Sequence, residues 1–127
     1  MDITITPAKL AGAITPPPSK SQAHRLIIAA ALAGGTSVIT NVAMSQDIAA
    51  TLSCMRALGA SAEQDGSTLT VTGLGDRRTP FTPCMCGAVH LDCSESGSTL
   101  RFLIPVALAV VGGAFFTGRG RLLARPQ

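Results

Sequence analysis

The sequence contains no tryptophan and no tyrosine, and phenylalanine occurs only four times in 127 residues. Hydrophobic residues still make up 46% of the chain, so its core must be built mainly from Ala, Leu, Ile and Val. The shortage of aromatic rings argues against a nucleic-acid-binding surface, because single-stranded bases stack on such rings. The length suits one domain of ordinary size.

Charge is also scarce, since only 13% of the residues are charged and the net charge is +3. The ten basic residues form no continuous run. They lie at positions 9, 20, 25, 56, 77, 78, 101, 119, 121 and 125. This distribution predicts separate contacts with small anions rather than a strip that binds nucleic acid.

Long hydrophobic runs are missing as well. The longest, Phe102 to Val111, is interrupted by Pro105 and is too short to span a membrane. Met1 leads directly into Asp-Ile-Thr-Ile, without the basic and apolar regions of a signal peptide. We therefore expect a cytoplasmic protein with no membrane partner.

The four cysteines lack the paired C-x-x-C spacing of a metal site, and only His90 lies near three of them. In the reducing cytosol, buried and inert thiols are the better interpretation. A metal site at Cys84, Cys86 and Cys93 is the weaker alternative, and we predict no metal.

Periodicity and turn residues predict an alternation of strands and helices. Asp65-Gly66 is a strong signal for a hairpin. The predicted strands are 2–6, 10–14, 36–40, 62–65, 68–72, 89–91 and 114–118, and the predicted helices are 22–33, 48–58 and the segment leading through 102–109.

The first candidate anion site begins where three prolines, 16–18, meet Ser19-Lys20-Ser21 at a helix start. Ser19 or Ser21 can cap that helix. Its free N–H groups and its dipole attract anions, and Lys20 and Arg25 add positive charge. An ordinary cap with two solvated cations is the alternative. We assign His24 no proton transfer and expect it to face solvent.

The second candidate is the turn 94–99, Ser-Glu-Ser-Gly-Ser-Thr, in which Gly97 permits close approach of the backbone to a ligand. Arg101 lies one turn into the helix that follows. Three further arginines, at 119, 121 and 125, suit a bidentate grip on carboxylate or phosphate. A plain capped turn and a solvated tail are the alternatives.

An internal repeat appears when Arg25 is aligned with Arg101. Each copy has a serine-rich turn, an Ala/Leu helix, a glycine pair and a strand. This indicates a duplicated β-α-β-α-β-β unit and an α/β (α+β) fold, with a first repeat at 16–73 and a second at 88–127. Because the second repeat is cut short, we expect a fragment of a longer protein.

Three motifs together resemble the EPSP synthase (3-phosphoshikimate 1-carboxyvinyltransferase) family. They are Pro18-Ser19-Lys20-Ser21-x-x-x-Arg25, Glu95-Ser96-Gly97-Ser98-Thr99-Leu100-Arg101-Phe102 and Arg121-x-x-x-Arg125-Pro126. The resemblance runs through the whole chain but covers only the N-terminal part of that family. It implies two lobes, each of three β-α-β-α-β-β units, that close on the substrates.

The resemblance also implies a reaction. The enolpyruvyl group of phosphoenolpyruvate moves to the 5-hydroxyl of shikimate 3-phosphate and phosphate leaves, without metal or cofactor. By resemblance, Lys20 contacts both substrates and is the candidate for proton transfer. Ser21 and Arg25 hold shikimate 3-phosphate, while Gly97 and Arg125 hold phosphoenolpyruvate. The role of Arg101 stays open.

The chain departs from the family where Pro18 replaces a frequent Gly and Ala23 a frequent Ser, but neither change removes a group that the anion site needs. The sister family, UDP-N-acetylglucosamine enolpyruvyltransferase, is a further alternative. Its typical cysteine has no counterpart in residues 117–127, which favours the shikimate enzyme.

For the domains, we expect residues 1–15 to form strands that belong with the missing lobe and residues 16–127 to form a partial substrate-binding lobe. The full-length protein is expected to be monomeric and the isolated chain inactive. A non-catalytic phosphate-binding module, or a remnant that self-associates through exposed sheet edges, is the alternative from another class.

Overall fold

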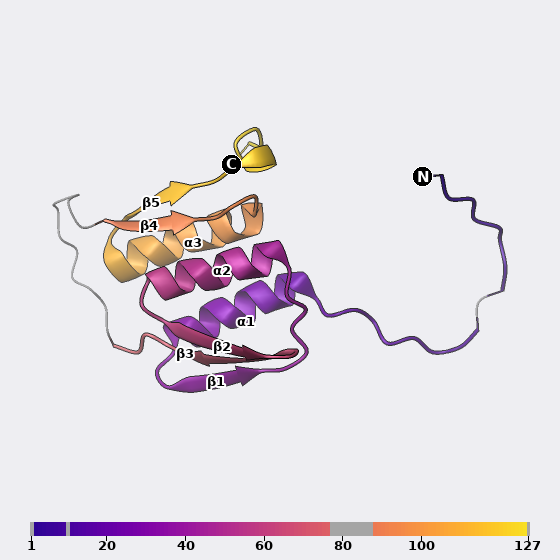
Figure 1. Ribbon diagram of the computed structural model, residues 1–127, viewed down its shortest axis with the longest axis horizontal. Coiled ribbons are helices and arrows are strands. Elements are labelled where there is room, and N and C mark those ends of the chain that lie inside the picture. The colour runs from indigo at the N-terminus through magenta and orange to yellow at the C-terminus, as the bar shows by residue number, and fades with distance from the viewer. Residues whose placement is uncertain (1, 10, 77–87, 127) are drawn as a thin grey trace.

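The computed structural model describes residues 2–9, 11–76 and 88–126. Three helices lie side by side, with a three-stranded sheet along one flank and a pair of strands along the other (Figure 1). The elements are, in order, α1 (Lys20–Leu32), β1 (Thr36–Ile39), α2 (Gln46–Ala57), β2 (Ser61–Asp65), β3 (Thr68–Thr72), β4 (Val89–Asp92), α3 (Gly97–Val111), β5 (Ala114–Thr117) and the short 3-10 helix η2 (Gly120–Leu122).

The larger sheet is antiparallel, with strand order β1-β3-β2. β2 and β3 form the hairpin that Asp65-Gly66 predicts, and Gly66 has a φ of 55° at its tip. Leu69 and Val71 alternate with less buried residues along β3. This period of two places them on the face covered by the helices.

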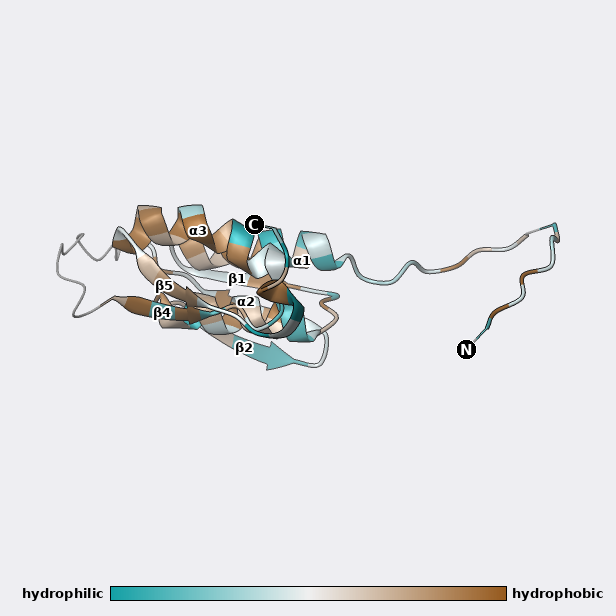
Figure 2. Cartoon of the chain, turned by 90° about the horizontal axis from the view of Figure 1, so that it is seen from above, coloured by the Kyte–Doolittle hydropathy of each residue, from teal (hydrophilic) through white to brown (hydrophobic). Residues whose placement is uncertain are grey.

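The smaller sheet pairs β4 with β5 in parallel, with Val89 opposite Ala114 and Asp92 opposite Thr117. Parallel neighbours require a crossover, which α3 supplies. Figure 2 shows α3 as largely hydrophobic beyond its first turn. The mixed α/β fold class expected from the sequence is confirmed.

The core lies between the helices and both sheets. Its fully buried side chains include Ile27 of α1, Ile48 and Met55 of α2, Leu91 of β4 and Leu103 of α3. Full burial of a side chain of this size contributes roughly 1.5–3 kcal/mol. Aliphatic contacts between the helices therefore join the two sheets into one body, as the lack of Trp and Tyr requires.

The three helices begin on the same side of the molecule, where β1, β4 and β5 end (Figure 1). Each has a serine N-cap whose Oγ accepts a backbone N–H: Ser19 from Gln22, Ser45 from Ile48 and Ser96 from Thr99. The first helix starts two residues earlier than predicted, which puts Lys20 and Ser21 into its first turn.

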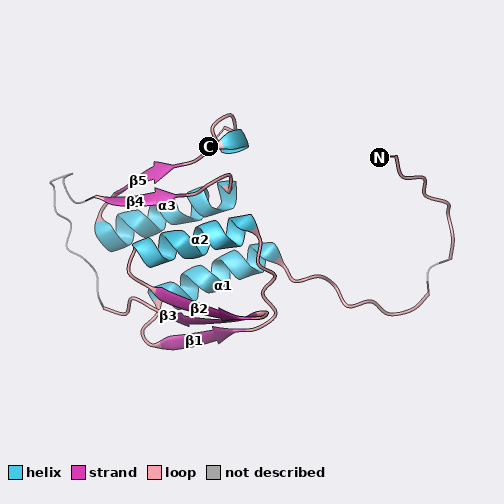
Figure 3. Ribbon diagram, viewed as in Figure 1, coloured by secondary structure: helices cyan, strands magenta, loops and turns pink. Residues whose placement is uncertain are grey.

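The N-terminal segment differs from expectation. No strand forms in residues 2–9 or 11–19, which run as extended chain away from the helices (Figure 3). Strands at 2–6 and 10–14 were expected. Their alternating residues have no neighbouring strand here, and a strand needs such a neighbour to pair its backbone groups. Pairing with another lobe stays a prediction.

Within the described ranges, no helix combines the length and the apolar character needed to cross a membrane. Cys84 and Cys86, two of the three cysteines in the alternative metal site, lie outside the described residues. The described residues contain no cluster of His, Cys, Asp and Glu that could hold a metal ion.

Candidate functional site

Lys20 is the first residue of α1, and its ammonium forms an ion pair with Oδ2 of Asp47 in the first turn of α2. Both side chains reach solvent, with 54% and 29% of their surface exposed. An ion pair this exposed contributes little to stability. It does aim the lysine at the start of α2, so the starts of two helices share one charged contact.

Arg25 lies one turn further along α1, and its Nη1 donates to the backbone oxygen of Ser21 at 3.3 Å. Its guanidinium carbon is 5.5 Å from the ring centroid of Phe102 on α3. The guanidinium thus spans the gap between α1 and α3 by a cation–π contact. Ser21 is exposed beside it.

Gly97 is the first residue of α3, and Arg125 lies opposite it. A Cβ at Gly97 would stand 3.8 Å from Nη1 of Arg125 and 3.8 Å from Cδ1 of Leu122. The two residues that the resemblance assigns to phosphoenolpyruvate therefore face each other. A small anion between them could meet the N-terminal N–H groups of α3 on one side and a guanidinium on the other.

The segment that carries Arg125 is anchored to the turn before α3. The backbone N–H of Arg119 donates to the backbone oxygen of Ser94 at 2.8 Å, and Arg119 Nε donates to Ser94 Oγ at 3.1 Å. Arg101 Nη2 donates to the backbone oxygen of Pro126 at 2.9 Å. The segment is therefore attached to the fold through its backbone, while the side chains of Arg119, Arg121 and Arg125 stay exposed, and Arg101 contacts its end.

A buried polar chain connects the three helices beneath this surface. Nδ1 of His24 is 2.8 Å from Oγ1 of Thr51, which is 2.8 Å from Oγ1 of Thr99. The hydroxyl of Thr99 donates to Oγ of Ser96 at 2.7 Å. The expectation that His24 faces solvent is wrong, because only 1% of its surface is exposed.

Burial lowers the pKa of His24, and the charge of Lys20 adds to this, while Asp47 opposes it. The imidazole is therefore neutral at neutral pH. Its Nε2 is buried and has no hydrogen-bond partner among the described residues.

Cys54 and Cys93 are both buried and free. The Sγ of Cys54 donates to the backbone oxygen of Asp92 at 3.3 Å. A hydrogen bond with Cys93, together with burial, raises the pKa of the Cys54 thiol. The same hydrogen bond lowers the pKa of Cys93. A buried, protonated thiol is unreactive, which supports the structural interpretation of Cys54.

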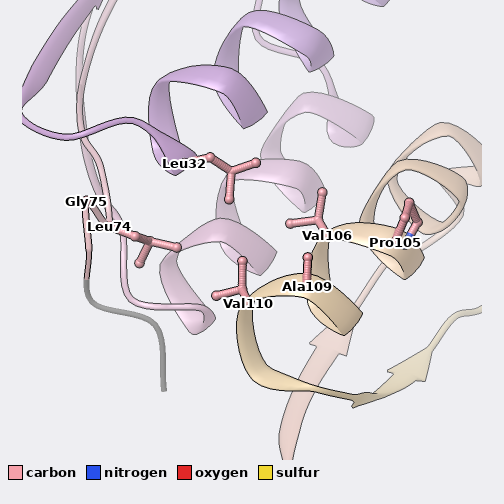
Figure 4. A pocket seen from close by; sticks show the side chains of 7 residues that line it. All are labelled: Leu32, Leu74, Gly75, Pro105, Val106, Ala109 and Val110. Atoms are coloured by element: carbon pink, nitrogen blue, oxygen red, sulfur yellow. The ribbon is translucent and has the colours of Figure 1, made fainter. Parts of the chain in front are cut away.

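An apolar pocket of about 290 Å³ opens at the far ends of α1 and α3 (Figure 4). Leu32, Leu74, Val106 and Val110 are among the side chains that line it. Among the described residues, no charged or hydroxyl side chain lines this pocket, so these residues offer phosphate no binding group. The candidate anion-binding groups all lie at the opposite ends of these helices.

The order of these groups along the chain matches a known family. A family model described as EPSP synthase (3-phosphoshikimate 1-carboxyvinyltransferase) matches residues 5–127. The chain belongs to the EPSP synthase family. The 3-phosphoshikimate 1-carboxyvinyltransferase of Clostridium perfringens (strain 13 / Type A) is 45% identical over 127 residues, which cover 98% of this chain and 28% of that protein.

Other members of the EPSP synthase family are also similar to this chain over only part of their length. The relative from Clostridioides difficile (strain 630) is 42% identical over 98% of this chain and 29% of its own length. The solved EPSP synthase from Acinetobacter baumannii has a TM-score of 0.74 and 31% identity, over 91% of this chain and 25% of that one. The chain therefore spans less than a third of the length of these relatives.

Within this EPSP synthase segment, sequence reasoning missed two features. Asp47 was not among the candidate residues, yet it is the partner of Lys20. Thr51 and Thr99 were given no joint role, because their positions in two helices do not reveal that the helices meet there. The only sequence signal for this contact was that Thr51 lies four residues after Asp47 on the same helix, and such a spacing is weak evidence.

Proposed function

We propose that this chain is the N-terminal part of an enzyme that transfers the enolpyruvyl group of phosphoenolpyruvate to the 5-hydroxyl of shikimate 3-phosphate. The observation that carries the proposal is the opposition of Gly97 and Arg125 beside the helix start that bears Lys20 and Arg25. Two anionic substrates need two adjacent cationic sites, and these residues supply them.

Each residue has a defined role in the proposal. Ser21 and Arg25 hold the phosphate of shikimate 3-phosphate, and Gly97 and Arg125 hold phosphoenolpyruvate. Lys20 contacts both substrates. These charge-assisted contacts bring the 5-hydroxyl to C2 of phosphoenolpyruvate and offset the negative charge that the two substrates bring together.

The reaction begins with an addition that moves two protons. The 5-hydroxyl loses a proton as its oxygen bonds to C2 of phosphoenolpyruvate, and the methylene carbon of phosphoenolpyruvate gains one. Loss of a methyl proton then restores the double bond as the C–O bond to phosphate breaks and phosphate leaves. Lys20, at the junction of the two sites, is placed to act in proton transfer. This chemistry needs neither a metal nor a cofactor.

The remainder of the protein completes the site in this proposal. Ile3, Ile5 and Ile14 are 78%, 85% and 92% exposed on extended chain, and they suit strands that pair within the second lobe. Residues 16–127 form part of the substrate-binding lobe. The isolated chain lacks the groups of the other lobe and is inactive. The complete enzyme is a cytoplasmic monomer that serves aromatic amino acid biosynthesis.

The proposal can be tested by completing the chain. We would fuse it to the part of the Clostridium perfringens relative that follows the matched segment and measure phosphate release from both substrates. The fusion should be active, and Lys20→Met should abolish turnover. Lys9→Met, which changes the other lysine of the chain, should leave turnover unchanged. Full activity of Lys20→Met would contradict the catalytic assignment.

A non-catalytic module that self-associates is the second candidate. It is favoured by three exposed apolar side chains on α1 and α3, since Leu26, Ile104 and Leu108 are 43%, 47% and 65% exposed. A size that depends on concentration, combined with an inactive fusion, would support it.

A further inference from the structure

The four buried polar side chains among the described residues all belong to one chain of contacts. They are His24, Thr51, Ser96 and Thr99, with exposed fractions of 1%, 0%, 2% and 0%. The hydroxyls of Thr51 and Thr99 each also lie 3.3 Å from the backbone oxygen of Asp47. The network therefore includes one group from the start of each helix.

This network is a poor way to gain stability. The surrounding core is apolar, and polar groups lose hydration when they are buried. The unpaired Nε2 of His24 adds to that loss. An aliphatic residue at each position would fill the same space without this loss of hydration. Satisfied polar contacts do, however, select one arrangement of the helices, because they are directional.

Three members of the network, His24, Ser96 and Thr99, lie within one turn of a residue that the proposed function uses. His24 follows Lys20 by one helical turn and directly precedes Arg25. Ser96 and Thr99 flank Gly97 on either side. Thr51 lies between these two groups, one turn after Asp47, the partner of Lys20.

We propose that His24, Thr51, Thr99 and Ser96 form a positioning network that sets the Gly97 turn of α3 relative to the Lys20 turn of α1. The inference rests on the proposed function for the identity of the ligands. Thr51 is its central member, because its hydroxyl joins the imidazole of α1 to the hydroxyls of α3. None of the four side chains is assigned a contact with substrate.

The two ligands should respond differently when the network is broken. Phosphoenolpyruvate uses Lys20 on α1 and Gly97 on α3, so its site depends on the spacing of these helices. Within this chain, shikimate 3-phosphate uses Lys20, Ser21 and Arg25, which all lie on α1. A general loss of stability would lower the affinity for both ligands alike, whereas a loss of positioning would lower the affinity for phosphoenolpyruvate.

The test is a nitrogen-15 amide NMR titration of the 127-residue chain with each ligand separately. Thr51→Val replaces the hydroxyl by a methyl of similar shape, and Thr51→Ser keeps the hydroxyl. Thr70→Val is the matched control, because it removes a hydroxyl from β3 on the far side of α1 and α2. We expect Thr51→Val to raise the Kd of phosphoenolpyruvate by about tenfold or more, and that of shikimate 3-phosphate by less than about twofold.

Thr51→Ser, which keeps the hydroxyl, should bind phosphoenolpyruvate with the affinity of the wild type. Thr70→Val should change neither Kd. Equal weakening of both ligands by Thr51→Val, or no weakening in a folded variant, overturns the inference. If Thr51→Val loses its dispersed spectrum, Thr99→Val and Thr99→Ser form the replacement pair, with the same outcomes on the two ligands.

A second measurement needs no ligand, so it separates this inference from the proposed function. His24→Leu should shift the amide resonance of Gly97 in the wild-type background, and this shift should disappear in the Thr51→Val or Thr99→Val background. An equal shift in both backgrounds, or none in either, overturns the network. If the wild-type chain binds neither ligand, this measurement still decides the network, and the fusion protein decides the proposed function.

Discussion

Replacing Gly97 by alanine should weaken the binding of phosphoenolpyruvate and leave the stability of the fold nearly unchanged. The added Cβ would stand 3.8 Å from both Arg125 Nη1 and Leu122 Cδ1, which is ordinary contact distance. Gly97 is not among the glycines with positive φ, so the backbone can accept alanine. Alanine is also the better helix former, and the free energy of unfolding should change by less than about 1 kcal/mol.

The same methyl group points toward Arg125, into the space that phosphoenolpyruvate would occupy. Forcing extra volume into a fitted site costs typically about 1–3 kcal/mol, which corresponds to roughly 5- to 150-fold weaker binding. The contacts proposed for shikimate 3-phosphate lie on α1, so its affinity should stay within about twofold of the wild type.

The assay is an NMR titration of Gly97→Ala with each ligand, together with urea unfolding. Gly34→Ala is the matched control, since its Cβ would meet only Gly75 Cα at 3.9 Å near the opposite end of α1. Unchanged affinity for phosphoenolpyruvate in folded Gly97→Ala would refute the placement of that ligand between Gly97 and Arg125. A large loss of stability would refute the packing argument.

Two further predictions concern stability. Gly73→Ala should destabilise the chain by about 3 kcal/mol or more, because its Cβ would overlap the backbone oxygen of Ala33 and lie 2.5 Å from that of Ala30. An unchanged urea midpoint would contradict this. Because burial lowers the pKa of His24, protonation favours the unfolded chain, so the free energy of unfolding should fall as the pH drops below 6.5, by at most about 1.4 kcal/mol per pH unit. Urea unfolding between pH 7.5 and 5.5 measures this slope, which should be smaller in His24→Leu, and an equal slope in both proteins would exclude His24 as its origin.

The sequence predicted those features that depend on neighbours a few residues away. Ser19 caps its helix because its hydroxyl accepts the backbone N–H of Gln22, which lies three residues further along the chain. Asp65-Gly66 directs the hairpin because a tight turn requires particular backbone angles at its tip. The order of helices and strands from residue 20 to 76 follows from such local signals.

The N-terminal strands show where a local signal is insufficient. Residues 2–6 alternate as a strand should, and yet no strand forms there in the described structure. The pattern selects an extended backbone, but the hydrogen bonds of a strand come from another segment. No property of residues 2–6 alone supplies that segment.

By itself, the sequence determined the order of the helices, the hairpin and the residues able to bind anions, because these depend on short-range geometry and on chemical type. Only the tertiary structure placed Arg125 opposite Gly97, paired Lys20 with Asp47 and buried His24 against Thr51. Those contacts join residues far apart in the chain, and they exist only because aliphatic packing brings the three helix starts together at one end of the fold.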